Sequence, residues 1–404
     1  MKKPAPSPFA AHWSLDPDVV FLNHGSFGAC PLPVLSYQSR IRARMERGPV
    51  SFLVRELEPL LDEARAALAG FVGAEADDIA FVPNATTGVN TVLRSLSFEE
   101  GDELLTTTHE YNASRNALDF VAERSGASVR VVDIPFPIAS SDVVLARVMD
   151  AVTPCTRLCL IDHVTSLTGV VMPAEDLCVS LAKRGVDTLV DGAHAPGMLP
   201  LHIDRLGATY YTGNCHKWMC APKGAAFLWV RRDKQEVIRP LTISHGANAE
   251  REDRSRFRLE FDWTGTWDPS AYLAVPEALR FLASLLPGGW EQLIESNRSL
   301  ALRARRILTE ALDAPVACPD EMIGTLAAVP LGRGTYHFTT TALSFDPMEE
   351  ILRERYGIEV PVLACPSGPA GILRISAQIY NTAEQYAYLA DAVSEISSIG
   401  ISAT

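Results

Sequence analysis

Short apolar or β-branched runs alternate with amphipathic segments between residues 79 and 230, and no other feature constrains the fold of this chain as strongly. Such alternation predicts βαβ units, and therefore an α/β layer built on a mainly parallel sheet with helices on its faces. In sheets of this kind, ligands bind at the carboxyl ends of the strands. The predicted strands are Ile79–Val82, Glu103–Thr107, Ser128–Val132, Thr156–His163, Thr188–Asp191, Ala208–Thr212 and Ala225–Val230, and the predicted helices between them are Thr87–Ser95, Ala113–Glu123, Val143–Val152 and Pro173–Arg184.

The 404 residues exceed the usual size of one domain, so we expect more than one. We predict an N-terminal arm (1–29) that contributes to the active site and the smaller domain, a large cofactor-binding domain (30–275) and a smaller C-terminal domain (276–404). Outside the alternating region the predicted elements are helices Ser36–Arg47, Leu57–Phe71, Pro269–Leu286, Trp290–Ala314 and Met348–Tyr356, and strands 335–345 and Ile372–Ala377.

Composition excludes several classes of function. Asp and Glu outnumber Lys and Arg by 49 to 36, and no basic run interrupts this excess, so we expect neither nucleic acid nor a membrane surface as a partner. No apolar run is long enough for a membrane helix. The eight cysteines lack paired zinc spacing, which predicts no metal site and fits a reducing cytoplasm. A small polar substrate fits this composition better.

The segment Tyr211–Trp218, followed by Pro222-Lys223-Gly224, contains the most informative residue, Lys217. A lysine among small and aromatic residues loses solvation, which lowers its pKa and makes it an imine-forming nucleophile. Taken alone, the same lysine fits an exposed turn better.

Asp191 and His194 strengthen this interpretation. They belong to Asp191-Gly192-Ala193-His194, which ends a predicted strand about 26 residues before Lys217. A buried aspartate at a strand end can hold the proton of a pyridine nitrogen, and His194 would then lie near the phenolic oxygen of the same ring.

A third motif, Asn84-Ala85-Thr86-Thr87-Gly88, is a polar turn that opens a helix. Free N–H groups and threonine hydroxyls at such a turn can bind a phosphate. Ordinary helix capping by Asn84 or Thr86 is the alternative. Because no Gly-Lys-Ser follows, a nucleoside triphosphate loop is not supported.

With these motifs in this order, the chain resembles the class-V aminotransferase superfamily of fold type I pyridoxal-phosphate (PLP) enzymes, and within it the isopenicillin N epimerase-like branch. The resemblance extends from Phe21–Gly28 to Leu373–Thr382. It implies a large domain with a seven-stranded-type sheet, a smaller α+β domain, PLP as cofactor, an amino acid as substrate and a homodimer with shared active sites.

The resemblance also implies residue roles. Lys217 would carry the imine, and Tyr111 would stack on the cofactor at a position where relatives often have histidine. Ser166 falls where asparagine is common, and Thr266 would reach the phosphate of the neighbouring subunit. The cofactor-binding set is Ala85, Thr86, Thr87, Tyr111, Ser166, Asp191, His194, Asn214, His216, Lys217 and Thr266; the catalytic residues are Lys217 and Tyr111; Asn23, His24 and Arg374 would bind the substrate.

Arg374 lies in an apolar predicted strand, where an unpaired guanidinium would be costly. Its fork of donors matches the α-carboxylate of an amino acid. A structural salt bridge with a side-chain carboxylate is the alternative.

Several reactions remain open after Lys217 removes the Cα proton. Reprotonation on the opposite face gives epimerisation, with Tyr111 or another pocket residue as the acid, whereas loss of a Cβ substituent gives elimination, as in a C–S lyase. Transamination is a third outcome, and desulfuration would need a reactive thiol, for which Cys365 and Cys215 are candidates. A catalytically silent binding protein is the alternative from a different class.

Overall fold

The computed structural model of the chain describes residues 2–331, 346–364 and 371–399. Its largest feature is a seven-stranded sheet in the order β2-β8-β7-β6-β5-β3-β4. Only β8 runs antiparallel to its neighbours, so the predicted mainly parallel sheet is confirmed. The strands are β2 (Ile79–Val82), β3 (Glu103–Thr107), β4 (Ser128–Val132), β5 (Thr156–Asp162), β6 (Asp187–Asp191), β7 (Tyr210–Asn214) and β8 (Ala226–Val230).

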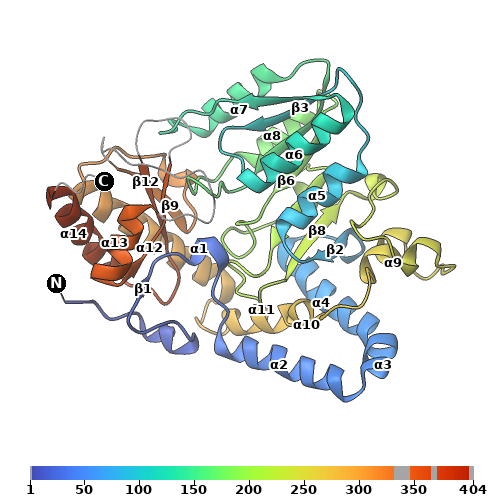
Figure 1. The fold of residues 1–404 in the computed structure, drawn as a ribbon, viewed down its shortest axis with the longest axis horizontal. Helices are drawn as coiled ribbons and strands as arrows, with labels where there is room; N and C mark the ends of the chain where they lie inside the picture. The colour runs from blue at the N-terminus through green and yellow to red at the C-terminus, as the bar shows by residue number, and fades with distance from the viewer. Residues whose placement is uncertain (1, 332–345, 365–370, 400–404) are drawn as a thin grey trace.

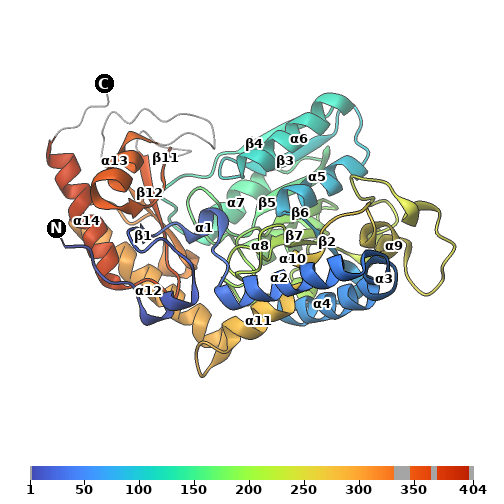
Figure 2. The same cartoon turned by 60° about the horizontal axis from the view of Figure 1, so that its bottom comes forward.

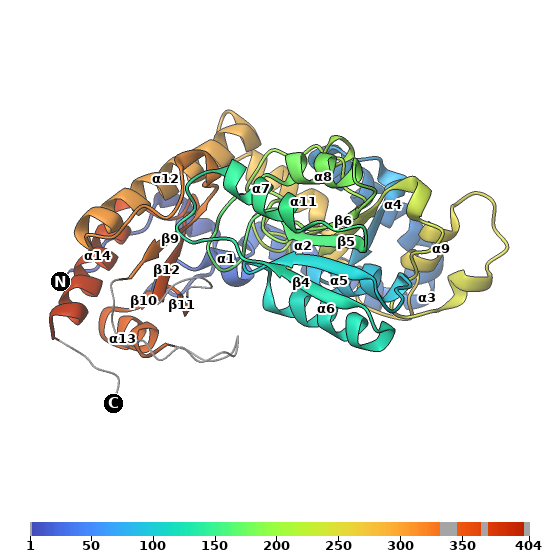
Figure 3. The same cartoon turned by 90° about the horizontal axis from the view of Figure 1, so that it is seen from above.

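Helices cover both faces of this sheet, as Figure 3 shows. Leu158 and Leu160 of β5 pack into the core beneath one set of helices, while Cys159 and Ile161 pack into the opposite core, as the two-residue period of a strand requires. The first face carries α5 (Ala85–Ser95), α6 (Asn112–Ser125) and α9 (Arg256–Asp262), and the second carries α4 (Leu57–Val72), α7 (Ser141–Ala151), α8 (Ala174–Ala182), α10 (Ser270–Leu273) and α11 (Val275–Ala283).

Figures 1 and 2 show α2 (Leu32–Arg47) and α4 converging on the short α3 (Pro49–Ser51). They are joined by α3 and a π-helical turn (Phe52–Glu56). The helix α2 packs against α10 and α11. This layer connects the N-terminal arm to the body of the molecule.

A three-stranded sheet in the order β11-β12-β9 lies at the other end of the molecule (Figure 1). The N-terminal arm packs on this part, because β1 (Val20–Phe21) pairs with β10 (Ile358–Glu359). The short helix α1 (His24–Phe27) lies between the two sheets. The other elements of this part are α12 (Gly289–Ala311), β9 (Leu326–Pro330), α13 (Pro347–Tyr356), β11 (Val362–Ala364), β12 (Gly371–Ser376) and α14 (Ala383–Ile399).

Some predicted elements differ from the structure. The helix predicted from Pro269 to Leu286 is two helices, because Pro276 cannot donate the hydrogen bond that a continuous helix would require. Helix α5 begins at Ala85 rather than Thr87, since Asn84 caps it. The predicted strand at 335–345 and Cys365 lie outside the described residues. The domain boundaries at residues 30 and 276 stay a prediction. None of the described helices combines the length and apolarity needed to cross a membrane.

Candidate active site

The sequence motifs meet at the carboxyl edge of the large sheet. Asp162 ends β5, Asp191 ends β6, and Lys217 follows β7 after Asn214. Because these strands are parallel, their last residues lie at one edge, where the N-terminus of α5 also packs against β7. The close approach of α5 requires glycine at position 88, since a Cβ there would lie 2.2 Å from Thr212 Oγ1.

Lys217 is half-buried at this edge. Its Nζ lies 3.0 Å from His194 Nε2. Burial lowers the Lys217 pKa to about 8, and the charge of Arg374 adds to this effect while Asp191 and Asp162 oppose it. The unprotonated, nucleophilic form of the amine is therefore more populated near neutral pH than for a lysine with the ordinary pKa of 10.5.

The N-terminal arm holds the Lys217 loop from the other side. His24 donates from Nε2 to the Lys217 carbonyl oxygen at 3.0 Å, and its Nδ1 lies 2.8 Å from the Tyr380 hydroxyl. Gly28 has φ 70° and approaches the loop so closely that a Cβ would lie 2.1 Å from the His216 carbonyl oxygen. Both His24 nitrogens are thus bonded within the protein, and this predicted substrate residue supports the lysine loop instead of presenting a free nitrogen.

Asp191 is buried and held by two donors, the Ser114 hydroxyl at 2.8 Å and the Ala193 N–H at 3.0 Å. Burial raises its pKa, although both hydrogen bonds and the charge of Lys217 oppose that shift. Because donors stabilise the ionised form, Asp191 is the carboxylate suited to a pyridinium proton.

Two further carboxyl groups, Glu110 and Asp162, join Asp191 in a cluster whose oxygens lie within 4.8 Å of one another. Burial, followed by the neighbouring carboxylates, raises the pKa of both well above the ordinary range. One oxygen of Asp162, Oδ2, is buried without a hydrogen-bond partner among the described residues. Three such groups cannot all be ionised in a buried site, so they hold protons between them.

The first turn of α5 forms the predicted phosphate end of the site. Asn84 Oδ1 accepts from the Thr87 N–H at 2.8 Å, and Asn214 Oδ1 accepts from the Ala85 N–H at 2.8 Å. The Thr86 N–H has no acceptor within the helix and is positioned for an anion. Asn84 therefore caps the helix, which was the alternative interpretation of this motif. The capping does not exclude a phosphate site at the same turn.

His216 follows two residues after Asn214, whose side chain contacts this turn, and its place near a phosphate stays a prediction. Its Nδ1 donates to the Ala225 carbonyl oxygen at 2.9 Å, and burial lowers its pKa to about 4. The neutral ring therefore has its second nitrogen, Nε2, available for a ligand.

Arg374 lies on β12 and brings the smaller sheet to the site. It donates to Ser26 Oγ at 2.7 Å, to Asn23 Oδ1 at 3.4 Å and to the Ser166 carbonyl oxygen. Within the described part of the chain it forms no ion pair, and its Nε has no partner. Burial lowers its pKa to about 10. The salt bridge considered as an alternative is thus not found among the described residues.

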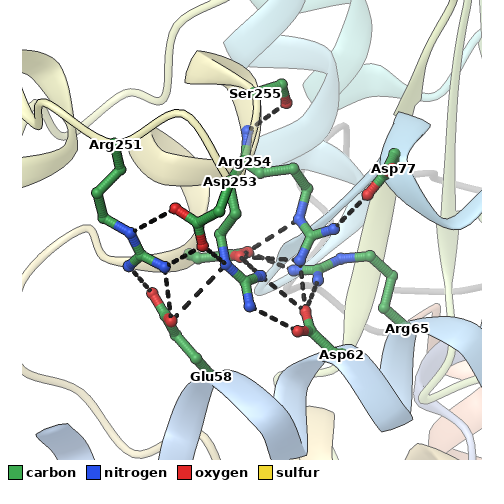
Figure 4. A network of polar contacts seen from close by, with 10 residues as sticks. Glu58, Asp62, Arg65, Asp77, Arg251, Asp253, Arg254 and Ser255 are labelled. Carbon is green, nitrogen blue, oxygen red and sulfur yellow. Dashed lines mark hydrogen bonds and ion pairs between the residues drawn. The ribbon is translucent and has the colours of Figure 1, made fainter.

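Two of the predicted site residues, Tyr111 and Thr266, are exposed to solvent. Tyr111 is 39% exposed at the start of α6, and its N–H donates to Glu110 Oε1 at 3.1 Å. Thr266 is exposed in a turn after α9, and no hydrogen bond among the described residues joins it to the rest of the site. The segment before this turn is anchored to α4 by ion pairs that Figure 4 shows, including Arg254 with Asp62.

Sequence reasoning missed Glu110, Ser114, Asp162 and Trp218. The sequence could have identified Asp162, because it is an acidic residue at the end of a continuous apolar run. Such a residue lies at the ligand-binding edge of a parallel sheet. Glu110 and Ser114 flank Tyr111 but gave no pattern of their own.

The large sheet, the half-buried Lys217 and the buried Asp191 at adjacent strand ends, and the helix terminus beside them are typical of fold type I PLP-dependent enzymes. The sequence profile of Aminotransferase class-V matches residues 34–389, and the chain belongs to this family. It is therefore a PLP-dependent enzyme, as predicted from its motifs.

Relatives and solved structures agree with this assignment. The chain is 39% identical to isopenicillin N epimerase of Amycolatopsis lactamdurans over 95% of its length and 96% of the relative. It is 31% identical to a probable chloroplastic L-cysteine desulfhydrase of Arabidopsis thaliana, over 98% of this chain and 86% of the relative. A C-DES mutant with glycine linked to its PLP cofactor shares the fold at a TM-score of 0.81 and 22% identity, covering 96% of this chain and 100% of that one.

The donor set suits PLP at each end. The amine of Lys217 matches an aldehyde, the carboxylate of Asp191 matches a pyridinium, and the first turn of α5 with His216 matches a phosphate. Asp162 Oδ2 and Arg374 Nε are buried polar atoms without partners among the described residues, which is typical of sites that bind a charged ligand.

Proposed function

We propose that this enzyme binds an α-amino acid, removes its Cα proton and returns a proton on the opposite face, which is an epimerisation. One observation carries the proposal: Arg374 is a buried guanidinium without an ion pair among the described residues, next to Asn23 and Ser26. A buried cation of this kind needs an anion, and the α-carboxylate of an amino acid matches its planar donors.

Lys217 performs two tasks in this proposal. Its amine would hold PLP, and as a free amine in the presence of the substrate it would take the Cα proton. PLP, when bound, supplies the electron-withdrawing ring that makes this proton acidic. Asp191 keeps a proton on the ring nitrogen, which its two hydrogen-bond donors allow by stabilising its carboxylate.

Tyr111 is the proposed acid for the second face. It starts α6, the helix that also carries Ser114, the hydroxyl donor of Asp191. The exposed position of Tyr111 lets its hydroxyl exchange protons with solvent between turnovers. The higher identity to isopenicillin N epimerases than to desulfhydrases supports the same outcome.

Elimination from a cysteine or cysteine conjugate is the second candidate, because several relatives at about 30% identity are named L-cysteine desulfhydrases. Elimination needs no thiol on the enzyme, whereas desulfuration does. Burial raises the pKa of the Cys30 thiol to about 12 and raises those of Cys215 and Cys220 further, so these thiols are poor nucleophiles. These three thiols therefore favour elimination over desulfuration, and Cys365 lies outside the described residues.

The proposal includes a homodimer in the cytoplasm. Thr266 lies on the surface of a single chain, in a turn that the resemblance assigns to the partner's phosphate site. The seven described cysteines are free thiols, which fits a reducing compartment.

The cofactor test uses absorbance. The protein reconstituted with PLP should show a band at about 420 nm from cofactor bound to Lys217. Lys217→Ala should lose it, and the surface variant Lys183→Ala should keep it. If reconstituted wild-type protein shows no such band, the proposed role of Lys217 is wrong.

The reaction test uses NMR in deuterated water with a panel of L-amino acids and cysteine conjugates. Epimerisation leaves the substrate intact with deuterium at Cα and lost chirality. Pyruvate formation would instead indicate elimination, alanine with released sulfide would indicate desulfuration, and a keto acid formed only with an amino acceptor would indicate transamination.

A further inference from the structure

Trp218 is buried directly after the lysine, and its only polar atom points at His194. The indole Nε1–H donates to His194 Nδ1 at 3.3 Å. On the opposite side of the same imidazole, Nε2 lies 3.0 Å from Lys217 Nζ. One histidine ring thus bridges the indole and the reactive amine.

An indole nitrogen can only donate a hydrogen bond, so His194 Nδ1 must accept and carries no proton. Burial, and then the charge of Lys217, lowers the His194 pKa well below its ordinary value, so the ring is neutral. A neutral imidazole has one N–H, and here it must be Nε2–H, the atom that faces Lys217. The alternative tautomer would bring two N–H groups together and leave the buried indole without an acceptor, which disfavours it by roughly 10- to 100-fold.

We propose that Trp218 is a positioning residue that fixes the tautomer of His194, so that the Nε2–H of His194 donates a hydrogen bond to the Lys217 nitrogen. An ammonium group has no lone pair to accept this bond, whereas a neutral amine does. The arrangement therefore favours the nucleophilic form of the lysine. This inference rests on the proposed role of Lys217 only for its effect on cofactor capture; the tautomer itself is independent of that role.

Other charged groups also act on this pair and set the background for any pH dependence. Arg374 disfavours the charged forms of both Lys217 and His194, while the carboxylates favour the charged lysine. The titratable groups that face the pair are His24 from α1, Asp162 from β5, Asp191 from β6, His216 from the lysine loop and Arg374 from β12.

The first measurement is the tautomer in unmodified, cofactor-free protein. Long-range ¹⁵N–¹H spectra of protein labelled with ¹⁵N-histidine, assigned with His194→Gln, should show the proton on Nε2 both below and above the Lys217 pKa of about 8. A proton on Nδ1 in the wild type would overturn the proposal. Because this measurement needs no Trp218 variant, it stands even if that variant does not fold.

The second measurement removes the donor. In Trp218→Phe, the Nδ1–H tautomer becomes accessible, and His194 Nε2 can then accept from the Lys217 ammonium. We expect the pKa of Lys217 to rise by about one unit, so that capture of PLP at neutral pH slows about tenfold. Trp290→Phe is the matched control, because its indole N–H donates to the Leu279 carbonyl oxygen, away from the site.

A double-variant cycle separates the tautomer from packing. The amide of His194→Gln can donate to Lys217 whatever residue 218 is, so Trp218→Phe should have no further effect on capture in that background. An equal tenfold effect in both backgrounds would show that Trp218 acts only through packing and would overturn the proposal. A failure of the proposed role of Lys217 would give a different result from either of these. In that case the absorbance band of the reconstituted wild type would survive in Lys217→Ala.

Discussion

Two clusters of charge in this molecule, each with buried members, differ in how their charges are paired. Between α4 and α9, Arg65 pairs with Asp262, and Arg254 and Arg258 pair with Asp62, so each charge meets an opposite one (Figure 4). At the carboxyl edge of the sheet, the described residues offer no ion pair to Lys217 or Arg374. We infer that the charges in ion pairs stabilise the fold, whereas the charges without an ion pair are available to bind a charged ligand.

The pKa shifts show that burial without an ion pair disfavours the charged forms of the groups at the sheet edge. Burial lowers the pKa of Lys217 to about 8 and of Arg374 to about 10, and it raises that of Asp162. In the network, burial also opposes ionisation of Asp62, but the hydrogen bonds and charges of Arg254 and Arg258 outweigh it and lower the pKa to about 2. The three predictions below test this difference.

The largest effect is expected from breaking a compensated pair. Arg65→Met keeps the aliphatic stem but leaves the carboxylate of Asp262, which is 8% exposed, without its main partner. We expect a loss of about 3–5 kcal/mol in the free energy of unfolding, toward the lower figure because Arg258 also contacts Asp262. Urea unfolding of the cofactor-free protein measures it. Arg280→Met removes an arginine that pairs with Glu277 but is itself 67% exposed, so it should lose less than about 1 kcal/mol, and equal losses in the two variants would refute the comparison.

Removing an uncompensated charge should affect function but not stability. In Arg374→Met, kcat/KM should fall on the order of 100-fold because the substrate carboxylate loses its partner. The free energy of unfolding should stay the same or rise, since a buried, unpaired guanidinium is no longer desolvated. Arg355→Met, in an exposed pair with Glu395, should change neither quantity by much. A large loss of stability in Arg374→Met would assign the arginine to the fold.

The smallest expected effect is that the free energy of unfolding changes with pH in opposite directions for variants of the two clusters. The raised pKa of Asp162 means that the folded state binds more protons than the unfolded state, so this group destabilises the protein increasingly as the pH rises above 3.8, the ordinary pKa of the group. Asp162→Asn should therefore gain about 1–3 kcal/mol relative to wild type above that pH, because the amide replaces an unpartnered carboxyl oxygen.

Asp62→Asn is the matched opposite. Asp62 has a lowered pKa, so its stabilisation is complete above about pH 4 and is lost as the pH falls toward about 2. Because its side chain is 41% exposed, screening limits the cost of the variant near neutral pH to about 1 kcal/mol. Urea midpoints across pH should diverge in opposite directions for the two variants, and parallel curves would contradict the assignment of the two clusters.

The sequence by itself determined the layer architecture and placed the candidate cofactor residues at strand ends. Alternating runs fix strands and helices locally, so β2, β3 and β4 have exactly the predicted bounds. Lys217, Asp191 and the turn before α5 were recognisable because each follows a strand, and parallel strands bring their ends together. Asn23 and Arg374, although 351 residues apart, were also anticipated, through the resemblance to a family.

Only the tertiary structure decided which polar groups have partners. Nothing in the local sequence of Trp218 shows that its N–H meets His194, because that contact depends on the path of the loop after β7. The carboxyl cluster of Glu110, Asp162 and Asp191 likewise arises from three separate segments at one sheet edge. Local patterns encode which element a residue joins, whereas the proton held by a side chain depends on neighbours that only the folded chain supplies.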